Sequence, residues 1–215
     1  LARNQISDLT PLSGLKSLRR LNATGLSKLE EANAKKLKKA LPGCVFQHDF
    51  MSDSEKIEAG VRVKINKPVG VLTREDFSKV KQFDIGAFQK YTDVSYLANL
   101  TELEGLTIAA NEVKDIKPLA GLTKLKVLYI DRNQIADVKP LVWLKNLEEL
   151  HTNKNQINDL SSLAGLNSLT LLDLRNNPKL TKDSVEQLKQ ALPDCDIRHN
   201  AKKTVASTRE TNRKK

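Results

Sequence analysis

The chain has 215 residues, of which 39% are hydrophobic but only 4% are aromatic, and it carries a formal net charge of +10. Residues 51–200 hold equal numbers of acidic and basic side chains, so the charge excess lies in the two flanking segments. A neutral centre argues against specific nucleic-acid binding, and no run approaches the ~20 apolar residues needed to insert into a membrane.

The first 50 residues look like the end of a structural unit. Residues 4–48 match residues 155–199 without a gap, so that Asn4-Gln5-Ile6 corresponds to Asn155-Gln156-Ile157. We therefore expect residues 1–50 to form the last repeat and the C-terminal cap of an upstream module that this sequence contains only in part. Two layouts remain open, because this segment either stacks on the next unit or is loosely tethered to it. Met51 is either a linker residue or the start of an independent reading frame.

Residues 51–82 carry two helix-start signals. Ser52 with Glu55, and Thr73 with Asp76, have the spacing of capping boxes, in which side chain and backbone satisfy each other reciprocally. This segment is therefore predicted to be a helical N-terminal cap.

Residues 83–177 repeat with a period of 22, which is the most informative feature of the sequence. Leucine and isoleucine recur in register as L-x-x-L-x-L-x-x-N-x-I-x-D-L-x-P-L-x-x-L. The asparagines of this pattern are Asn111, Asn133, Asn155 and Asn177.

Physical chemistry explains this unit. The alternating L-x-L segment predicts a strand with one buried face, and so short a strand needs neighbours stacked beside it. The asparagine amide can donate and accept hydrogen bonds, so we expect it to pair with backbone groups inside the turn that follows the strand. Stacking parallel strands with short return arms gives a curved solenoid.

The residues after the last repeat are predicted to cap the solenoid. Residues 178–200 are predicted to form a cap whose helix starts at Thr181, and residues 201–215 form a basic tail that is expected to be disordered.

The return arm resembles that of the bacterial internalin-like leucine-rich-repeat family, which typically reads D-L-x-P-L-x-x-L. The motif stands here as Asp8-Leu9-Thr10-Pro11-Leu12, Asp115-Ile116-Lys117-Pro118-Leu119 and Asp137-Val138-Lys139-Pro140-Leu141. The resemblance implies an α/β fold, a right-handed solenoid with a parallel sheet on its concave face and short helical caps. It also implies protein binding without catalysis. It favours a secreted or cell-surface location over a cytoplasmic one, although the sequence leaves the compartment open.

No constellation of residues indicates catalysis or a cofactor. The histidines lie apart from any nucleophile with a carboxylate partner, and no glycine-rich loop leads from a strand into a helix. Asp93, Asp115, Asp137 and Asp159 recur once per repeat and raise the question of calcium. Each offers a single carboxylate, far short of six to eight oxygen ligands, so we expect turn bonding and no metal site.

The exposed face of the predicted sheet is the candidate binding site. Side chains between the buried leucines point to solvent, and they become aromatic and charged from the third strand onward. The residues predicted to contact a partner are Tyr129, Asp131, Arg132, His151, Asn153, Asp173 and Arg175. Trp143 replaces a residue that is glycine in other repeats, so it is either tucked against a loop or a second contact on the outer side.

These observations predict a non-catalytic module that recognises a partner protein of unknown identity through the concave face. Two alternatives remain. The face could bind a glycan or cell-wall polymer, although Tyr129 is the only tyrosine, tryptophan or phenylalanine in it, or the chain could be a passive scaffold in a tandem-repeat protein.

Overall fold

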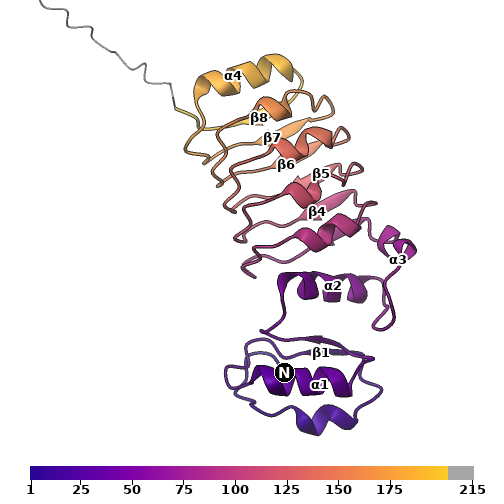
Figure 1. The fold of residues 1–215 in the computed structure, drawn as a ribbon. Coiled ribbons are helices and arrows are strands. Elements are labelled where there is room, and N and C mark those ends of the chain that lie inside the picture. Colours follow the sequence, from indigo (N-terminus) through magenta and orange to yellow (C-terminus); the bar gives the residue numbers. More distant parts are fainter. Residues whose placement is uncertain (203–215) are drawn as a thin grey trace, which may run out of the picture.

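The structure is a computed structural model that describes residues 1–202, and it forms an elongated stack of short strands and loops (Figure 1). Most of the tail expected to be disordered, residues 203–215, therefore lies outside the described residues. The strands and helices are, in chain order, η1 (Thr10–Gly14), β1 (Arg20–Asn22), α1 (Glu31–Ala40), β2 (Val45–Gln47), α2 (Asp53–Lys64), α3 (Arg74–Ser78), β3 (Gln82–Asp84), η2 (Ser95–Asn99), β4 (Gly105–Thr107), η3 (Lys117–Leu119), β5 (Val127–Tyr129), η4 (Lys139–Trp143), β6 (Glu149–His151), η5 (Ser161–Leu163), β7 (Leu171–Asp173), α4 (Lys182–Ala191) and β8 (Asp196–Arg198).

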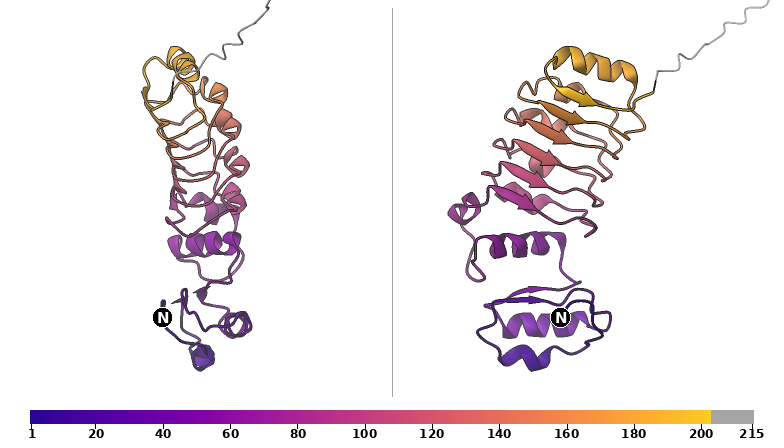
Figure 2. Two further views of the ribbon diagram at one scale, coloured as in Figure 1. Left: turned by 90° about the vertical axis from the view of Figure 1, so that its left-hand side faces the viewer. Right: turned by 180° about the vertical axis from the view of Figure 1, so that it is seen from behind.

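All strands pair in parallel, in two separate sheets. One sheet contains β1 and β2, and the other contains β3 to β8 in sequence order. The strands lie on one side of the stack, and the short 3₁₀ helices η2 to η5 lie on the other (Figure 2). The expected solenoid of parallel strands with short helices is confirmed. In the part of the chain that the structure describes, no helix is long and apolar enough to cross a membrane.

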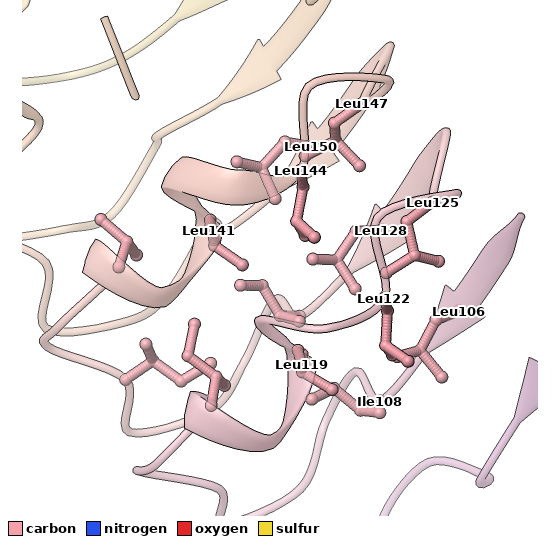
Figure 3. Packing of buried hydrophobic residues seen from close by; sticks show 14 of the residues in the cluster. Leu106, Ile108, Leu119, Leu122, Leu125, Leu128, Leu141, Leu144, Leu147 and Leu150 are labelled. Atoms are coloured by element: carbon pink, nitrogen blue, oxygen red, sulfur yellow. The ribbon is translucent and has the colours of Figure 1, made fainter. Parts of the chain in front are cut away.

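The interior is a continuous column of aliphatic side chains. Leucines from the strands, the return arms and the 3₁₀ turns meet there (Figure 3). Leu106, Leu128 and Leu150 point inward from neighbouring strands, and each is no more than 2% exposed. Burying a leucine side chain stabilises a fold by about 1.5–3 kcal/mol, so the repeated leucines supply most of the driving force for stacking.

A ladder of buried asparagines connects successive repeats. The Asn133 Oδ1 accepts a hydrogen bond from the Val113 backbone N–H at 3.0 Å, in the preceding repeat. Its Nδ2 donates to the Ile108 carbonyl of that repeat at 2.9 Å and to the Ile130 carbonyl of its own repeat at 3.1 Å. Asn155 and Asn177 make the same set of bonds one and two repeats further on. Each amide therefore satisfies backbone groups that would otherwise be buried without partners.

The aspartate of each return arm bonds to its own turn. The carboxylates of Asp93, Asp115, Asp137 and Asp159 each accept the backbone N–H two residues further on, at 2.8–2.9 Å. This is the turn bonding that the sequence predicted, and it starts the 3₁₀ helix that follows.

Helices close both ends of the larger sheet. Ser52 with Glu55 and Thr73 with Asp76 form the two predicted capping boxes, at the starts of α2 and α3. The Thr181 side chain accepts the Ser184 N–H at the start of α4, as predicted.

The helix α2 contacts both sheets. Its Ile57 and Val61 belong to the core of residues 51–202, and its Asp53 accepts the Thr92 and Asp93 N–H groups at 2.8 and 3.0 Å. Burial raises the pKa of Asp53, but these hydrogen bonds outweigh it and hold the pKa below its usual value.

We call residues 1–50 the first unit and residues 51–202 the second unit.

The two units meet through a small apolar cluster. Val45 of β2, Met51 and Ala59 of α2 bury one another, each with 5–7% exposure. An ion pair between Lys38 and Glu55, 3.0 Å apart, lies beside this cluster. Of the two layouts left open by the sequence, the structure has the first unit stacked on α2.

Replacing Asn133 with alanine should lower the free energy of unfolding by about 1–3 kcal/mol, because buried backbone groups of two repeats lose their partner. Urea denaturation followed by circular dichroism measures the loss. Gln134→Ala, at the exposed neighbouring position, serves as the control. An unchanged midpoint for Asn133→Ala would contradict the role of the ladder.

Replacing Val45 with aspartate, the residue at the matching position 196 of the second cap, should separate the two units. The change puts an unpaired charge into the apolar cluster, at a cost of about 2–3 kcal/mol. We expect faster chymotrypsin cleavage at the neighbouring Phe50, measured by mass spectrometry. Asp196→Val, at an exposed position, should leave that rate unchanged. Equal cleavage of Val45→Asp and the parent chain would mean that the cluster does not hold the units together.

Candidate binding site on the sheet face

The strand register brings the outward side chains of the larger sheet into columns. Cα pairing places Tyr129 between Thr107 and His151, and His151 between Tyr129 and Asp173. A second column passes through Val127 and Glu149 on the same strands. Neighbours in a column are ~4.8 Å apart along the sheet, so their side chains meet directly. We call the outward residues of β3 to β8 the sheet face.

The centre of the sheet face is an aromatic pair. The rings of Tyr129 and His151 are stacked, with centroids 4.3 Å apart and an interplanar angle of 16°. The His151 Nε2 lies 3.5 Å from a carboxylate oxygen of Glu149, two residues earlier on β6. Stacking fixes both rings, so the pair can contact a partner with little loss of side-chain entropy.

A hollow adjoins the free side of this pair. It has a volume of about 180 Å³ and is lined by residues of β3, β4 and β5 together with Lys64 of α2. The hollow exists because small residues, Gly105 and Thr107, stand on β4 next to Val127 and Tyr129. The Gln82 side chain lies over Gly105, where an added Cβ would meet its Oε1 at 1.8 Å.

The position of Asp173 differs from what the sequence predicted. We predicted its side chain to be solvent-exposed, but the residue is only 3% exposed. The carboxylate accepts bonds from the Arg175 Nε at 2.9 Å and Nη2 at 2.7 Å, and from the Arg175 backbone N–H at 3.1 Å. The neighbouring guanidinium folds over it and shields it from water.

Electrostatics keep this aspartate ionised. Burial raises the pKa of Asp173, but the side-chain and backbone hydrogen bonds from Arg175 outweigh that effect and hold the pKa below its usual value. The Arg175 side chain is still 54% exposed. Asp173 therefore positions Arg175, and Arg175 is the group that a partner can reach.

The remaining predicted residues lie at the margin where the strands turn. Asp131 and Asn153 are half-buried, and Arg132 is exposed. The Asp131 and Asn153 carbonyls accept the backbone N–H groups of Ala110 and Arg132, which ties this margin to the sheet. Arg132 has a left-handed backbone with φ of 53°, and that conformation directs the chain off the strand.

Trp143 lies away from the sheet face. It ends η4, on the opposite side of the stack, and 65% of it is exposed. Of the two interpretations of this residue, exposure favours a second contact over a side chain tucked against a loop.

Three further residues, Glu149, Asp196 and Arg198, are not among those that the sequence predicted to contact a partner. Arg198 pairs in register with Asp173, and its guanidinium forms an ion pair of 2.8 Å with Asp196. The step from Asp173 to Arg198 is 25 residues instead of 22, because α4 intervenes, so the period does not extend to it. The alternation of Asp196, Ile197 and Arg198 is the signal that could have identified this last strand.

The arrangement provides aromatic and charged side chains for contact. In residues 1–202, no three or more histidine, cysteine, aspartate or glutamate side chains are grouped to hold a metal ion. The sheet face is open and carries both signs of charge, as a surface for recognition does.

The fold has relatives among known proteins. A family model for leucine-rich repeats in two copies matches residues 101–143. The crystal structure of internalin C2 from Listeria monocytogenes is 27% identical with a TM-score of 0.55, over 93% of this chain and 69% of that one. No curated protein matches the chain.

Two further structures show the same fold at lower identity. Another internalin of Listeria monocytogenes is 22% identical, with a TM-score of 0.55, and the match covers 93% of this chain and 61% of that one. A leucine-rich-repeat protein of Leptospira interrogans is 19% identical with a TM-score of 0.55, covering 92% and 53%. The chain thus spans less than two thirds of the length of these two structures.

Replacing Arg175 with alanine should lower the free energy of unfolding at neutral pH by about 1–3 kcal/mol, because it leaves the buried Asp173 carboxylate without its partner. The pKa of Asp173 is depressed in the folded chain, so its pairing stabilises the fold above about pH 4 and ceases to do so as the pH falls through the folded value.

The difference in stability between Arg175→Ala and the parent chain should therefore shrink on acidification below about pH 4. Urea unfolding at pH 7 and at pH 3 measures it. Arg198→Ala, which breaks an exposed pair, should show little effect at either pH. A difference that is the same at both pH values would rule out the Asp173 pairing as its source.

Proposed function

We propose that this chain, which is similar to the leucine-rich-repeat structures of internalins, is a non-catalytic module that recognises a partner protein through the sheet face. The observation that supports this most is the stacked Tyr129–His151 pair, with the exposed guanidinium of Arg175 one strand beyond. Tyrosine and arginine are enriched among the residues that dominate binding energies. Here Tyr129 ends β5 and Arg175 follows β7 by two residues, so both are attached to strands whose positions are fixed by the core.

The dimensions of the sheet face suit a protein. Six strands at ~4.8 Å spacing span about 25 Å, and with its margin the face approaches the ~800 Å² that a standard interface buries per partner. A small metabolite is usually held in a concave apolar pocket, whereas the hollow beside Tyr129 is only about 180 Å³. It is large enough for one side chain of a partner.

The charged side chains of the sheet face would also help to select a specific partner. Glu149 on β6 carries a negative charge, whereas Arg175, two residues past the end of β7, and Arg198 on β8 carry positive charges, and all three are at least partly exposed. Such a pattern favours a partner with the complementary order of charges and disfavours others by like-charge repulsion. Trp143, on the other side of the stack, is a second contact in this proposal.

A glycan is the less favoured ligand. Sugars stack on aromatic faces, but one face of the Tyr129 ring is already covered by His151 at 4.3 Å. A single remaining aromatic face provides a weak platform for a polysaccharide.

The test is affinity capture from lysate and surface fractions of the source cells. The bait is the chain itself, compared with a variant carrying Tyr129→Ala, His151→Ala and Arg198→Ala. Arg175 is kept, since its loss would leave the buried Asp173 unpaired. The matched control replaces Lys114, Lys117 and Lys139, three exposed lysines of the return arms, with alanine. Circular dichroism checks that every bait is folded.

We expect a protein that is retained by the chain and by the lysine control but weakened at least about tenfold on the sheet-face variant, as the loss of an interface hot spot requires. Equal retention by all three would reject the sheet face, and loss with Trp143→Ala alone would move the site to the outer side. Binding of purified cell-wall polymer without any protein would favour the glycan alternative. No capture at all would favour the scaffold.

A further inference from the structure

A cavity lies between the two units, next to the ends of β1, β2 and β3. Its volume is about 410 Å³, and small-ligand sites usually have about 300–1,000 Å³. It shares no lining residue with the hollow beside Tyr129, so the two sites are separate. The first unit contributes Asn22, Gln47 and His48 to its walls, and the second unit contributes Met51, Ile85 and Tyr91.

The charged groups of the cavity already have partners within the chain. Both carboxylate oxygens of Asp49 accept the Gly25 backbone N–H, at 3.1 and 2.8 Å. The Lys56 Nζ is 3.4 Å from the Asp53 carboxylate and lies over the Tyr91 ring, 5.4 Å from its centroid. A ligand therefore meets no unpaired charge here, and the cavity favours an uncharged molecule over an ion.

The uncharged polar groups of the cavity have unused hydrogen-bonding capacity. Asn22 uses only its Oδ1, which accepts from Thr24, and within residues 1–202 neither its Nδ2 nor the Gln47 side-chain amide makes a hydrogen bond. The His48 Nδ1 has no hydrogen-bond partner in these residues either, although only 5% of His48 is exposed. Buried polar atoms are nearly always paired, so this group of amides and imidazole points to a ligand that completes it.

Two exposed aromatic residues adjoin the cavity. Phe50, which is 41% exposed, follows the lining residue Asp49 directly, and its ring centroid is 6.0 Å from that of His48. Phe88, which is 76% exposed, directly precedes the lining residue Gln89. Aromatic side chains are therefore available beside a cavity whose walls carry amides.

The repeats themselves show that the fold does not require these two aromatic residues. Phe50 corresponds to Ala201 in the duplicated cap. Phe88 has the left-handed backbone, with φ of 59°, that Arg132 and Lys154 have in the turns after their own strands. A bulky aromatic residue is uncommon in that conformation, and strain of this kind concentrates at functional positions.

These groups together fit an N-acetylated sugar. The C–H groups of a sugar ring carry a slight positive charge and pack on the negative face of an aromatic ring. The acetamido group of such a sugar has an N–H donor and a C=O acceptor, to which the Gln47 and Asn22 amides are complementary. Its methyl group is apolar, and Met51 and Ile85 offer apolar surface in the same cavity.

We propose that the cavity between the units is a binding site for an N-acetylated sugar. Phe50 and Phe88 pack on the sugar ring, and the Gln47 amide bonds to the acetamido group. Because both units contribute walls, the bound sugar also opposes their separation. This site is independent of the sheet face, so a polymer of such sugars is retained by the sheet-face variant as well.

The first measurement is calorimetric titration of the full chain with N,N′-diacetylchitobiose and with cellobiose. The two disaccharides share their linkage and differ only in the acetamido group that replaces a hydroxyl on each ring. We expect the diacetylchitobiose to bind at least about tenfold more tightly, because cellobiose leaves the amides of the cavity unpaired.

Phe50→Ala and Phe88→Ala should each weaken the binding of diacetylchitobiose about fivefold to tenfold, because each removes a stacking surface. Both positions are exposed, and circular dichroism checks that the variants are folded. The matched control is Lys154→Ala, at an exposed position with the same left-handed backbone in a later repeat, and it should bind as the parent chain does.

Chymotrypsin cleavage at Phe50 provides the second measurement. At a diacetylchitobiose concentration ten times the dissociation constant, cleavage of the parent chain should slow about tenfold, because the sugar binds only when the units are together. The same concentration of cellobiose should slow it much less.

Absence of diacetylchitobiose binding, or equal binding of the two disaccharides, would overturn the proposal. So would binding that Phe50→Ala and Phe88→Ala leave unchanged while Tyr129→Ala abolishes it, because the sugar would then occupy the sheet face.

Discussion

Stacking of the repeats in the larger sheet depends on a ladder of buried amides, those of Asn111, Asn133, Asn155 and Asn177. A repeat of this kind must bend sharply after its strand, and the bend leaves backbone N–H and C=O groups in an apolar interior. The asparagine side chain can donate and accept at once, so a single residue such as Asn133 serves two repeats. Leucine burial supplies the driving force, but it is nondirectional, and the amide fixes the register in which the leucines stack.

The ladder also explains how the ends differ from the middle. Where a helix covers the solenoid, as α2 does in front of β3, the position holds Gln89 and the connecting bonds are absent. Where one unit ends against the next, the contact depends on Val45, Met51 and Ala59 instead. The second cap has Asp196 in place of Val45, and that residue is exposed. The two caps match in sequence, yet only the first has an apolar side chain at this position, where it meets α2.

The separation of inward from outward side chains leaves the chemistry of the sheet face free to vary. Inward residues such as Leu128 and Leu150 are constrained by packing, whereas their outward neighbours are constrained only by pairing across the strands. Side chains of very different chemistry can therefore stand next to one another without disturbing the fold. The Tyr129–His151 stack joins neighbours in a column, and the Asp173–Arg175 pair joins the last residue of β7 to a residue two positions further on.

Much of this could be predicted from the sequence, because a 22-residue period fixes the relation of each residue to its equivalents. The period determined the strands, the inward leucines, the ladder asparagines and the columns of the sheet face, while the spacing of Ser52 with Glu55 and of Thr73 with Asp76 identified the capping boxes. The period did not predict that Arg198 belongs to the sheet face, because α4 changes the spacing before β8. It also did not identify the hollow over Gly105, because that hollow arises from side chains of three strands. It also misjudged Asp173, because alternation gives the direction of a side chain but not what folds over it.

The sequence alone thus determined the architecture and the set of outward residues, since both follow from local periodicity and the need to bury leucines. Only the tertiary structure decided which of those residues are accessible, and how the first unit meets the second. Those features depend on contacts between side chains far apart in the sequence, such as Val45 with Ala59. They are set by size, charge and distance in three dimensions, which no period in the sequence encodes.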